Sequence, residues 1–183
     1  MKLHGFSKKE LLDIYYQMSL SRYLDDKQLI LLKQGKGYFH IGASGHEAAQ
    51  IAAARNFKPG FDYAYPYYRN QAFCLGWGMT SKEHLLSFLA KEDDPSSGGR
   101  QMPQHFGHKD LNIVSQSSST GTQYLQAVGV AFGMKKDGEK AVVYVSSGEG
   151  TTSQGDFHEA LNWASREKAP VIFHIQDNEY AIS

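Results

Sequence analysis

The stretch AVVYVSSGEGTTSQGDFHEALNWASREKAPVIFHIQ, residues 141–176, decides the fold. It opens with the apolar run AVVYVS, continues with the amphipathic segment DFHEALNWASREK and closes with the apolar run PVIFHIQ. Short apolar runs rich in β-branched residues predict strands, and an amphipathic segment between them predicts a helix. We therefore predict one β-α-β unit whose two strands are parallel.

The helix of this unit has a capping pattern and an apolar face. Asp156 and Glu159 stand at the spacing of a capping box, which favours a helix that starts here. Apolar residues then recur at helical spacing, so we expect one face of the helix to be buried. The residues of that face are Phe157, Ala160, Leu161 and Ala164.

Helical patterns also occupy the first part of the chain. Ser7 and Glu10 have capping-box spacing ahead of recurrent apolar residues, which predicts a helical N-terminal segment at about residues 7–34. A glycine-rich loop follows, and HEAAQIAAARNF then predicts a second helix. The aromatic stretch DYAYPYYRNQAF predicts a short strand and a turn before a helix near residues 69–77.

The middle of the chain contains two further helical patterns and a long polar stretch. SKEHLLSFLA predicts a short helix capped by Ser81, and TGTQYLQAVGVAFGMK predicts a helix whose small residues allow close packing. Residues 91–112, between them, predict a long surface loop. The whole pattern predicts an α/β fold with a parallel sheet and helices on both faces.

Composition and charge exclude several classes of protein. The chain has 183 residues, 41% of them hydrophobic, and its 19 basic and 19 acidic residues cancel. No basic field therefore indicates nucleic acid or an anionic membrane as a partner. Cys74 is the only cysteine, so an intrachain disulfide is impossible, and we interpret it as a buried small hydrophobe. No signal-peptide or membrane-span pattern is present, so we expect a cytoplasmic protein, or a mitochondrial matrix protein in a eukaryote.

Two polar residues follow the strands of the β-α-β unit. Glu149 comes after the first strand, and Asn178 comes after the second. Parallel strands joined by a crossover end at the same edge of the sheet, and neighbouring strands lie about 4.8 Å apart. Glu149 and Asn178 are therefore expected to face one point, at the edge where open α/β sheets bind ligands.

The chemistry of this edge favours a cation and phosphate together. A dinucleotide fingerprint would need its third glycine earlier than Gly155, and the Glu149 carboxylate would repel a phosphate. No Gly-Lys-Ser/Thr follows, so a Walker loop is excluded here. A hard divalent cation such as Mg²⁺ accepts carboxylate, amide and carbonyl oxygens together with phosphate. Glu149, Asn178 and a carbonyl near Tyr180 supply such a set. Alternatively, Glu149 is a solvated turn residue and Asn178 a turn former.

GEG at residues 148–150, with SQGDFHEALNWA and DNEYAIS after it, resembles the thiamine-diphosphate motif in α subunits of 2-oxo acid dehydrogenases. The blocks GHEAA, YPYYRNQAFCLGWG, GGRQMPQHFG and SQSSSTGTQYLQAVGVAFG fit the same family in the same order. GRQMPQH and the Glu of GEG resemble the branched-chain enzymes more than the pyruvate enzymes. The resemblance implies a thiamine-diphosphate-binding fold, with residues 1–183 as the N-terminal part of an α-type domain that is truncated here.

The resemblance also implies roles for individual residues. Glu149, Asn178 and the Tyr180 carbonyl match ligands of Mg²⁺. The positions that match the cofactor site as a whole are Tyr68, Arg69, Ser118, Thr120, Gly148, Glu149, Gly150, Thr151, Asn178 and Tyr180. Among them, Arg69 and Thr151 match positions at the diphosphate, and Ser118 and Thr120 match positions beside the aminopyrimidine. The residues that carry out the chemistry are expected outside this chain.

The implied activity is oxidative decarboxylation of a branched-chain 2-oxo acid, with transfer of the acyl group to a lipoyl group. The implied partners are a β subunit or β half and a lipoyl-bearing acyltransferase. A pyruvate or acetoin dehydrogenase α subunit is the first alternative. A Rossmann-type nucleotide-binding protein and a non-catalytic assembly fragment are the others.

Overall fold

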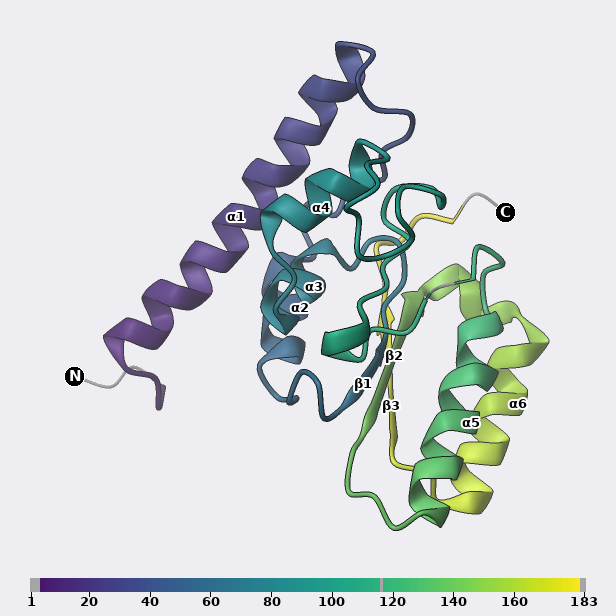
Figure 1. Ribbon diagram of the computed structural model, residues 1–183. Coiled ribbons are helices and arrows are strands. Elements are labelled where there is room, and N and C mark those ends of the chain that lie inside the picture. The colour runs from purple at the N-terminus through teal and green to yellow at the C-terminus, as the bar shows by residue number, and fades with distance from the viewer. Residues whose placement is uncertain (1–3, 116, 182–183) are drawn as a thin grey trace. The chain divides into compact units, whose positions relative to one another are not determined.

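The computed structural model describes residues 4–115 and 117–181, which form two compact units (Figure 1). One unit contains Met1–Asn56 and Arg69–Gln104. The other contains Phe57–Tyr68 and His105–Ser183. Each unit is therefore built from two separate segments of the chain.

The first unit is helical. Its helices are α1 (Lys8–Lys33), α2 (Glu47–Ala54), α3 (Gln71–Trp77) and α4 (Ser81–Phe88). Helix α1 starts with the predicted capping box, in which Ser7 Oγ accepts from the Glu10 amide and the Glu10 carboxylate accepts from the Ser7 amide. The predicted helices of this region are confirmed, and the core between α2 and α3 contains Ile51, Phe73 and Trp77 at 0% exposure.

The second unit contains the parallel sheet. Its elements are β1 (Tyr63–Tyr65), η1 (Lys109–Leu111), α5 (Thr122–Lys136), β2 (Val143–Gly148), η2 (Glu149–Ser153), α6 (Gly155–Glu167) and β3 (Val171–Gln176). The strands lie in the order β1-β2-β3 and both pairs are parallel. The predicted α/β class and the β-α-β unit β2-α6-β3 are confirmed.

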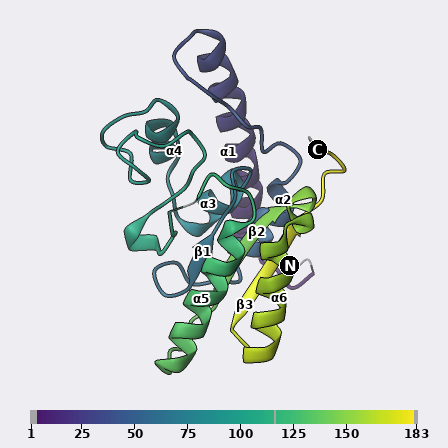
Figure 2. The same ribbon diagram turned by 90° about the vertical axis from the view of Figure 1, so that its right-hand side faces the viewer.

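Helices α5 and α6 pack side by side on one face of the sheet, as both views show (Figures 1 and 2). Val143 and Val145 point to this face and join Tyr124 of α5 and Ala160 of α6 in the core. Tyr144 alternates to the other face, where its ring meets Phe57 and His174 edge to face. Both faces of β2 are thus buried, which explains its continuous apolar run.

Asp62 connects the turn before β1 to the start of β2. This carboxylate is 6% exposed and accepts hydrogen bonds from two backbone amides, those of Lys58 at 2.7 Å and Val142 at 2.8 Å. The buried Asp62 carboxylate thus supplies the acceptor for two main-chain N–H groups that lie outside the strand pairing of the sheet.

Three details of the sequence interpretation are wrong. The cap of α4 is Thr80 rather than Ser81, because Thr80 has the extended backbone of an N-cap and accepts from the Glu83 amide. Helix α6 begins after Gln154, before the predicted Asp156 cap. Leu161 is 38% exposed in this chain, although Ala160 and Ala164 of the same face are buried.

The long polar stretch is only partly a surface loop. Its second half turns inward, and Gln104, His105 and Phe106 are no more than 4% exposed. Cys74 is buried as expected, and burial raises the pKa of its thiol. Within the described ranges, no helix is both long and apolar enough to cross a bilayer.

Candidate cofactor site

The carboxyl ends of β2 and β3 meet at the site predicted from the sequence. Gly148, the last residue of β2, pairs with Gln176, the last residue of β3. Glu149 follows Gly148, and its Oε2 accepts a hydrogen bond from the backbone amide of Asn178 at 3.4 Å. The parallel register therefore brings Glu149 and Asn178 together.

Two short turns shape the segment after β3. Asp177 Oδ1 accepts from the Glu179 amide at 2.8 Å, and Asn178 Oδ1 accepts from the Tyr180 amide at 2.9 Å. Glu179 has a left-handed backbone, with φ of 62°, and the Tyr180 side chain is 85% exposed. Because an amide oxygen has two lone pairs, Asn178 Oδ1 retains the capacity to bind a further group.

The segment after β2 forms the short 3-10 helix η2. Thr152 Oγ1 donates to the Glu149 carbonyl at 2.6 Å, and Thr151 is buried. A Cβ at position 150 would lie 3.0 Å from the Ala181 Cβ, which is closer than ordinary side-chain contact. Gly150 thus permits the chain after β3 to approach η2 closely.

The loop that contains Ser118 and Thr120 lies against η2. Gly121 ends this loop with φ of 102°, and a Cβ there would be 3.2 Å from the Gln154 Cβ. Ser118 is exposed, and its Oγ is 2.9 Å from Nε2 of the buried His105. The structure therefore places the Ser118 loop beside the turn that contains Thr151.

Tyr68 also lies near this edge of the sheet, after β1. Its ring packs on that of Tyr67 at a centroid distance of 4.9 Å. The Tyr67 amide donates to Ser146 Oγ at 3.2 Å, and the Tyr67 ring lies beside Gly148. Tyr67 is buried at 1% exposure, so the half-buried Tyr68 has a fixed support.

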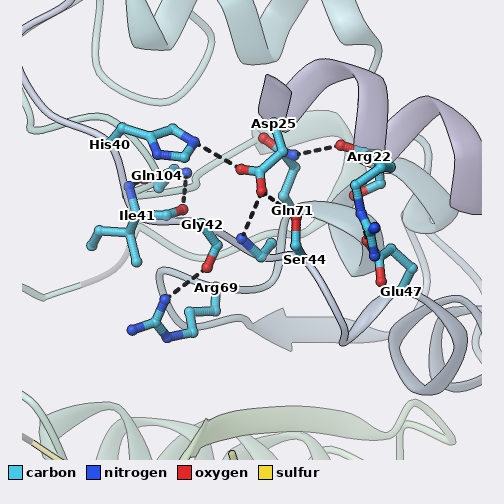
Figure 3. Close-up of polar contacts among 12 residues, drawn as sticks. Arg22, Asp25, His40, Ile41, Gly42, Ser44, Glu47, Arg69, Gln71 and Gln104 are labelled. Atoms are coloured by element: carbon cyan, nitrogen blue, oxygen red, sulfur yellow. Dashed lines mark hydrogen bonds and ion pairs between the residues drawn. The ribbon is translucent and has the colours of Figure 1, made fainter. Parts of the chain in front are cut away.

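Arg69 belongs to the helical unit. Its Nη1 donates to the Gly42 carbonyl at 2.7 Å (Figure 3). Its own carbonyl accepts from Gln50 Nε2 at 2.9 Å. Both the backbone and the guanidinium of Arg69 are thus held from within one unit. Its role at a diphosphate stays a prediction.

Sequence reasoning missed the supporting residues. His105 is absent from the predicted site residues, yet it contacts one of them, Ser118. Its place in the block GGRQMPQHFG, which carried part of the family resemblance, was the available signal. No local pattern indicated that Gly42 would bind Arg69, because that contact depends on the fold of the glycine-rich loop.

The donor atoms of the predicted metal set fit a hard divalent cation. They comprise the Glu149 carboxylate, the Asn178 amide oxygen and the Tyr180 carbonyl, and Mg²⁺ prefers oxygen ligands of these types. Across residues 4–115 and 117–181, no group of three or more His, Cys, Asp or Glu side chains could hold a metal ion. The predicted set has one carboxylate, and sites of this kind are completed by phosphate and water oxygens.

Comparison with known proteins identifies the family. Residues 15–183 match the model of the family described as dehydrogenase E1 component. The chain belongs to this family. The resemblance to α subunits of 2-oxo acid dehydrogenases is therefore confirmed, and the family favours that interpretation over a Rossmann-type nucleotide-binding protein.

Curated relatives cover nearly the whole chain. The chain is 44% identical to the 2-oxoisovalerate dehydrogenase subunit alpha of Bacillus subtilis, over 98% of this chain and 54% of that protein. It is 35% identical to the mitochondrial 2-oxoisovalerate dehydrogenase subunit alpha of Dictyostelium discoideum, over 98% and 40%. It is 37% identical to the pyruvate dehydrogenase E1 component subunit alpha of Staphylococcus aureus, over 96% and 44%. The chain thus spans about half the length of the relatives it matches.

Proposed function

We propose that residues 1–183 form the N-terminal part of the α-type, thiamine-diphosphate-binding domain of a 2-oxo acid dehydrogenase E1 component. One observation carries this proposal. The Glu149 carboxylate and Asn178 meet at the carboxyl ends of adjacent parallel strands. The distance between Glu149 Oε2 and the backbone nitrogen of Asn178 is 3.4 Å. A carboxylate at this position suits a phosphate ligand only when a cation lies between them.

The residues divide into three binding tasks. Glu149, Asn178 and the Tyr180 carbonyl would hold Mg²⁺. Gly148, Gly150 and Thr151 would border the diphosphate, with Tyr68 and Arg69 as further contacts. Ser118 and Thr120 would lie beside the aminopyrimidine. When bound, thiamine diphosphate supplies the electron sink for decarboxylation of a 2-oxo acid. We assign no catalytic residue to this chain.

A branched-chain 2-oxo acid is the substrate that we propose. The identity to a 2-oxoisovalerate dehydrogenase subunit is 44%, against 37% for the pyruvate dehydrogenase subunit. The GRQMPQH block supports the same choice. Comparing kcat/KM for 2-oxoisovalerate and pyruvate in the complete enzyme would test this proposal. A preference for pyruvate would reject a branched-chain substrate and support a pyruvate dehydrogenase α subunit. An acetoin dehydrogenase α subunit is the other alternative for the substrate of this enzyme.

The proposed partners are a β subunit or β half and a lipoyl-bearing acyltransferase that accepts the acyl group. The formal charge of zero gives no support for nucleic acid or membrane as a partner. The proposed location is the cytoplasm, or the mitochondrial matrix in a eukaryote.

An assembly fragment without catalytic function is a second candidate. Helix α1 exposes large aromatic side chains, with Tyr15 69%, Tyr16 62% and Tyr23 72% exposed. Such side chains are enriched in protein interfaces. This candidate predicts that a partner binds equally well to wild type and to Glu149→Gln, and that no thiamine diphosphate binds.

A cofactor titration distinguishes the two candidates. Thiamine diphosphate is titrated with and without Mg²⁺ into the enzyme assembled with its β part, as wild type, Glu149→Gln and Asp177→Asn. Loss of a metal ligand should raise the Kd by more than the roughly 10- to 100-fold that loss of an outer-shell partner costs. Asp177→Asn makes the same charge change one residue from Asn178 and should have a small effect.

Mg²⁺-dependent binding that is lost only in Glu149→Gln supports the proposal. Equal Kd values for the two variants would reject Glu149 as a metal ligand. Absence of binding to the wild-type assembly would reject the enzyme function itself.

A further inference from the structure

A buried carboxylate on α1 holds the loop that contacts Arg69. The Asp25 side chain is 4% exposed, and the His40 side chain that faces it is 5% exposed. Asp25 Oδ1 pairs with His40 Nε2 at 2.7 Å (Figure 3). Asp25 Oδ2 accepts from Ser44 Oγ at 2.7 Å and from the Ala43 amide at 3.3 Å. One carboxylate thus binds three residues of the glycine-rich loop.

Gln104 holds the same loop from another segment of the unit. Its Oε1 accepts from the Ile41 amide at 2.7 Å, and its Nε2 donates to the Ile41 carbonyl. Gln104 is 3% exposed and has a left-handed backbone, with φ of 64°. A non-glycine residue in this conformation is strained, and such strain persists only where the surrounding structure enforces it.

Gly42 lies between these two anchors, and its carbonyl accepts the hydrogen bond from Arg69 Nη1 at 2.7 Å (Figure 3). The anchors on Ile41 and Ala43 fix the direction of the Gly42 carbonyl, because those residues flank it on both sides. A guanidinium has a rigid plane, so fixing one Nη atom restricts the directions of its other donors.

We propose that Asp25 is a positioning residue for anion recognition by Arg69. It acts through His40, Ser44 and the Ala43 amide on the Gly42 carbonyl, which fixes the direction of the guanidinium with which Arg69 would bind a phosphate group of the cofactor. This inference rests on the proposed function, in which Arg69 contacts the diphosphate. A purely structural role for Asp25 would affect stability without depending on the Arg69 side chain.

A double-mutant cycle on the Kd of thiamine diphosphate separates the two roles. The assembled enzyme, saturated with Mg²⁺, is compared as wild type, Asp25→Asn, Arg69→Ala and the double variant. Arg69→Ala removes a charge-assisted bond and should raise the Kd roughly 10- to 100-fold. Asp25→Asn should raise it roughly 10-fold on its own and add little when Arg69 is already absent.

Two further variants complete the design. Asp26→Asn makes the same charge change at the next, exposed position of α1, and its Kd should equal that of wild type. Ser44→Ala removes one of the three hydrogen bonds to Asp25 from an exposed residue, so it keeps the test decisive if Asp25→Asn does not fold. It should raise the Kd by a few-fold, again only in the presence of Arg69.

Each outcome is decisive. A Kd effect of Asp25→Asn or Ser44→Ala that disappears in the Arg69→Ala background supports the inference. An effect that is additive with Arg69→Ala, or no effect while Arg69→Ala weakens binding, overturns it. If Arg69→Ala leaves the Kd unchanged, the inference fails while the proposed function stands. Failure of the wild-type enzyme to bind the cofactor overturns the proposed function, and the inference with it.

Discussion

Acid should destabilise the helical unit through His84. This side chain lies on α4 and is 3% exposed. Burial lowers its pKa from 6.5 to about 4, although Glu83 and Asp94 act in the opposite direction. At a pH between these two pKa values, His84 is therefore protonated in the unfolded chain and neutral in the folded chain. Stability is complete above about pH 6.5 and is lost as the pH falls toward 4.

The size of the effect follows from the two pKa values. At pH 5 the histidine is almost fully protonated in the unfolded chain and mostly neutral in the folded chain. Linkage then gives a loss of about 2 kcal/mol in the free energy of unfolding between pH 7.5 and pH 5. The His84→Gln variant lacks the titrating group, so its pH dependence should be smaller by that amount.

The assay can be confined to the helical unit. Trp77 on α3 is 0% exposed, whereas Trp163 on α6 is 47% exposed. A Trp163→Phe background leaves Trp77 as the fluorescence reporter during denaturant unfolding. Other histidines contribute equally to both proteins and cancel in the comparison. Equal pH dependence with and without His84 would refute the reasoning.

Two further predictions concern local hydrogen bonds. Thr80→Ala removes the N-cap of α4 and should cost about 1 kcal/mol in unfolding free energy, whereas Ser81→Ala, at the position that the sequence pattern suggested, should cost much less. Equal losses for the two variants would contradict the assigned cap. Asp62→Ala leaves the amides of Lys58 and of the half-buried Val142 without their acceptor and should cost about 1–3 kcal/mol, with faster hydrogen exchange at Val142 as the local readout. Unchanged exchange at Val142 would show that another group replaces the carboxylate.

The sequence predicted those parts of the fold that depend on local pattern. The capping box of Ser7 and Glu10 and the β-α-β unit both follow from short-range spacing. The meeting of Glu149 with Asn178 follows from topology, since parallel neighbours end at one edge. These features need no knowledge of distant contacts.

The remaining features depend on contacts between distant segments. Thr80 and Ser81 are both capping residue types, and only the backbone conformation selects Thr80. Asp25 is an ordinary acidic residue in a helical pattern, and its burial depends on a loop that the sequence leaves undefined. The binding of Arg69 to a main-chain carbonyl cannot be predicted from the spacing of side chains in the sequence.

The discontinuous make-up of the sheet unit has a consequence for biosynthesis. Strand β1 pairs with β2, and the whole segment Arg69–Gln104 of the other unit lies between them in the chain. During translation β1 therefore emerges long before the strand that completes it. A non-local parallel pairing of this kind closes slowly, because a large loop must be ordered first. Until β2 emerges, Tyr63 and Tyr65 belong to an incomplete sheet, and we expect this unpaired strand to expose the nascent chain to aggregation or to capture by a chaperone.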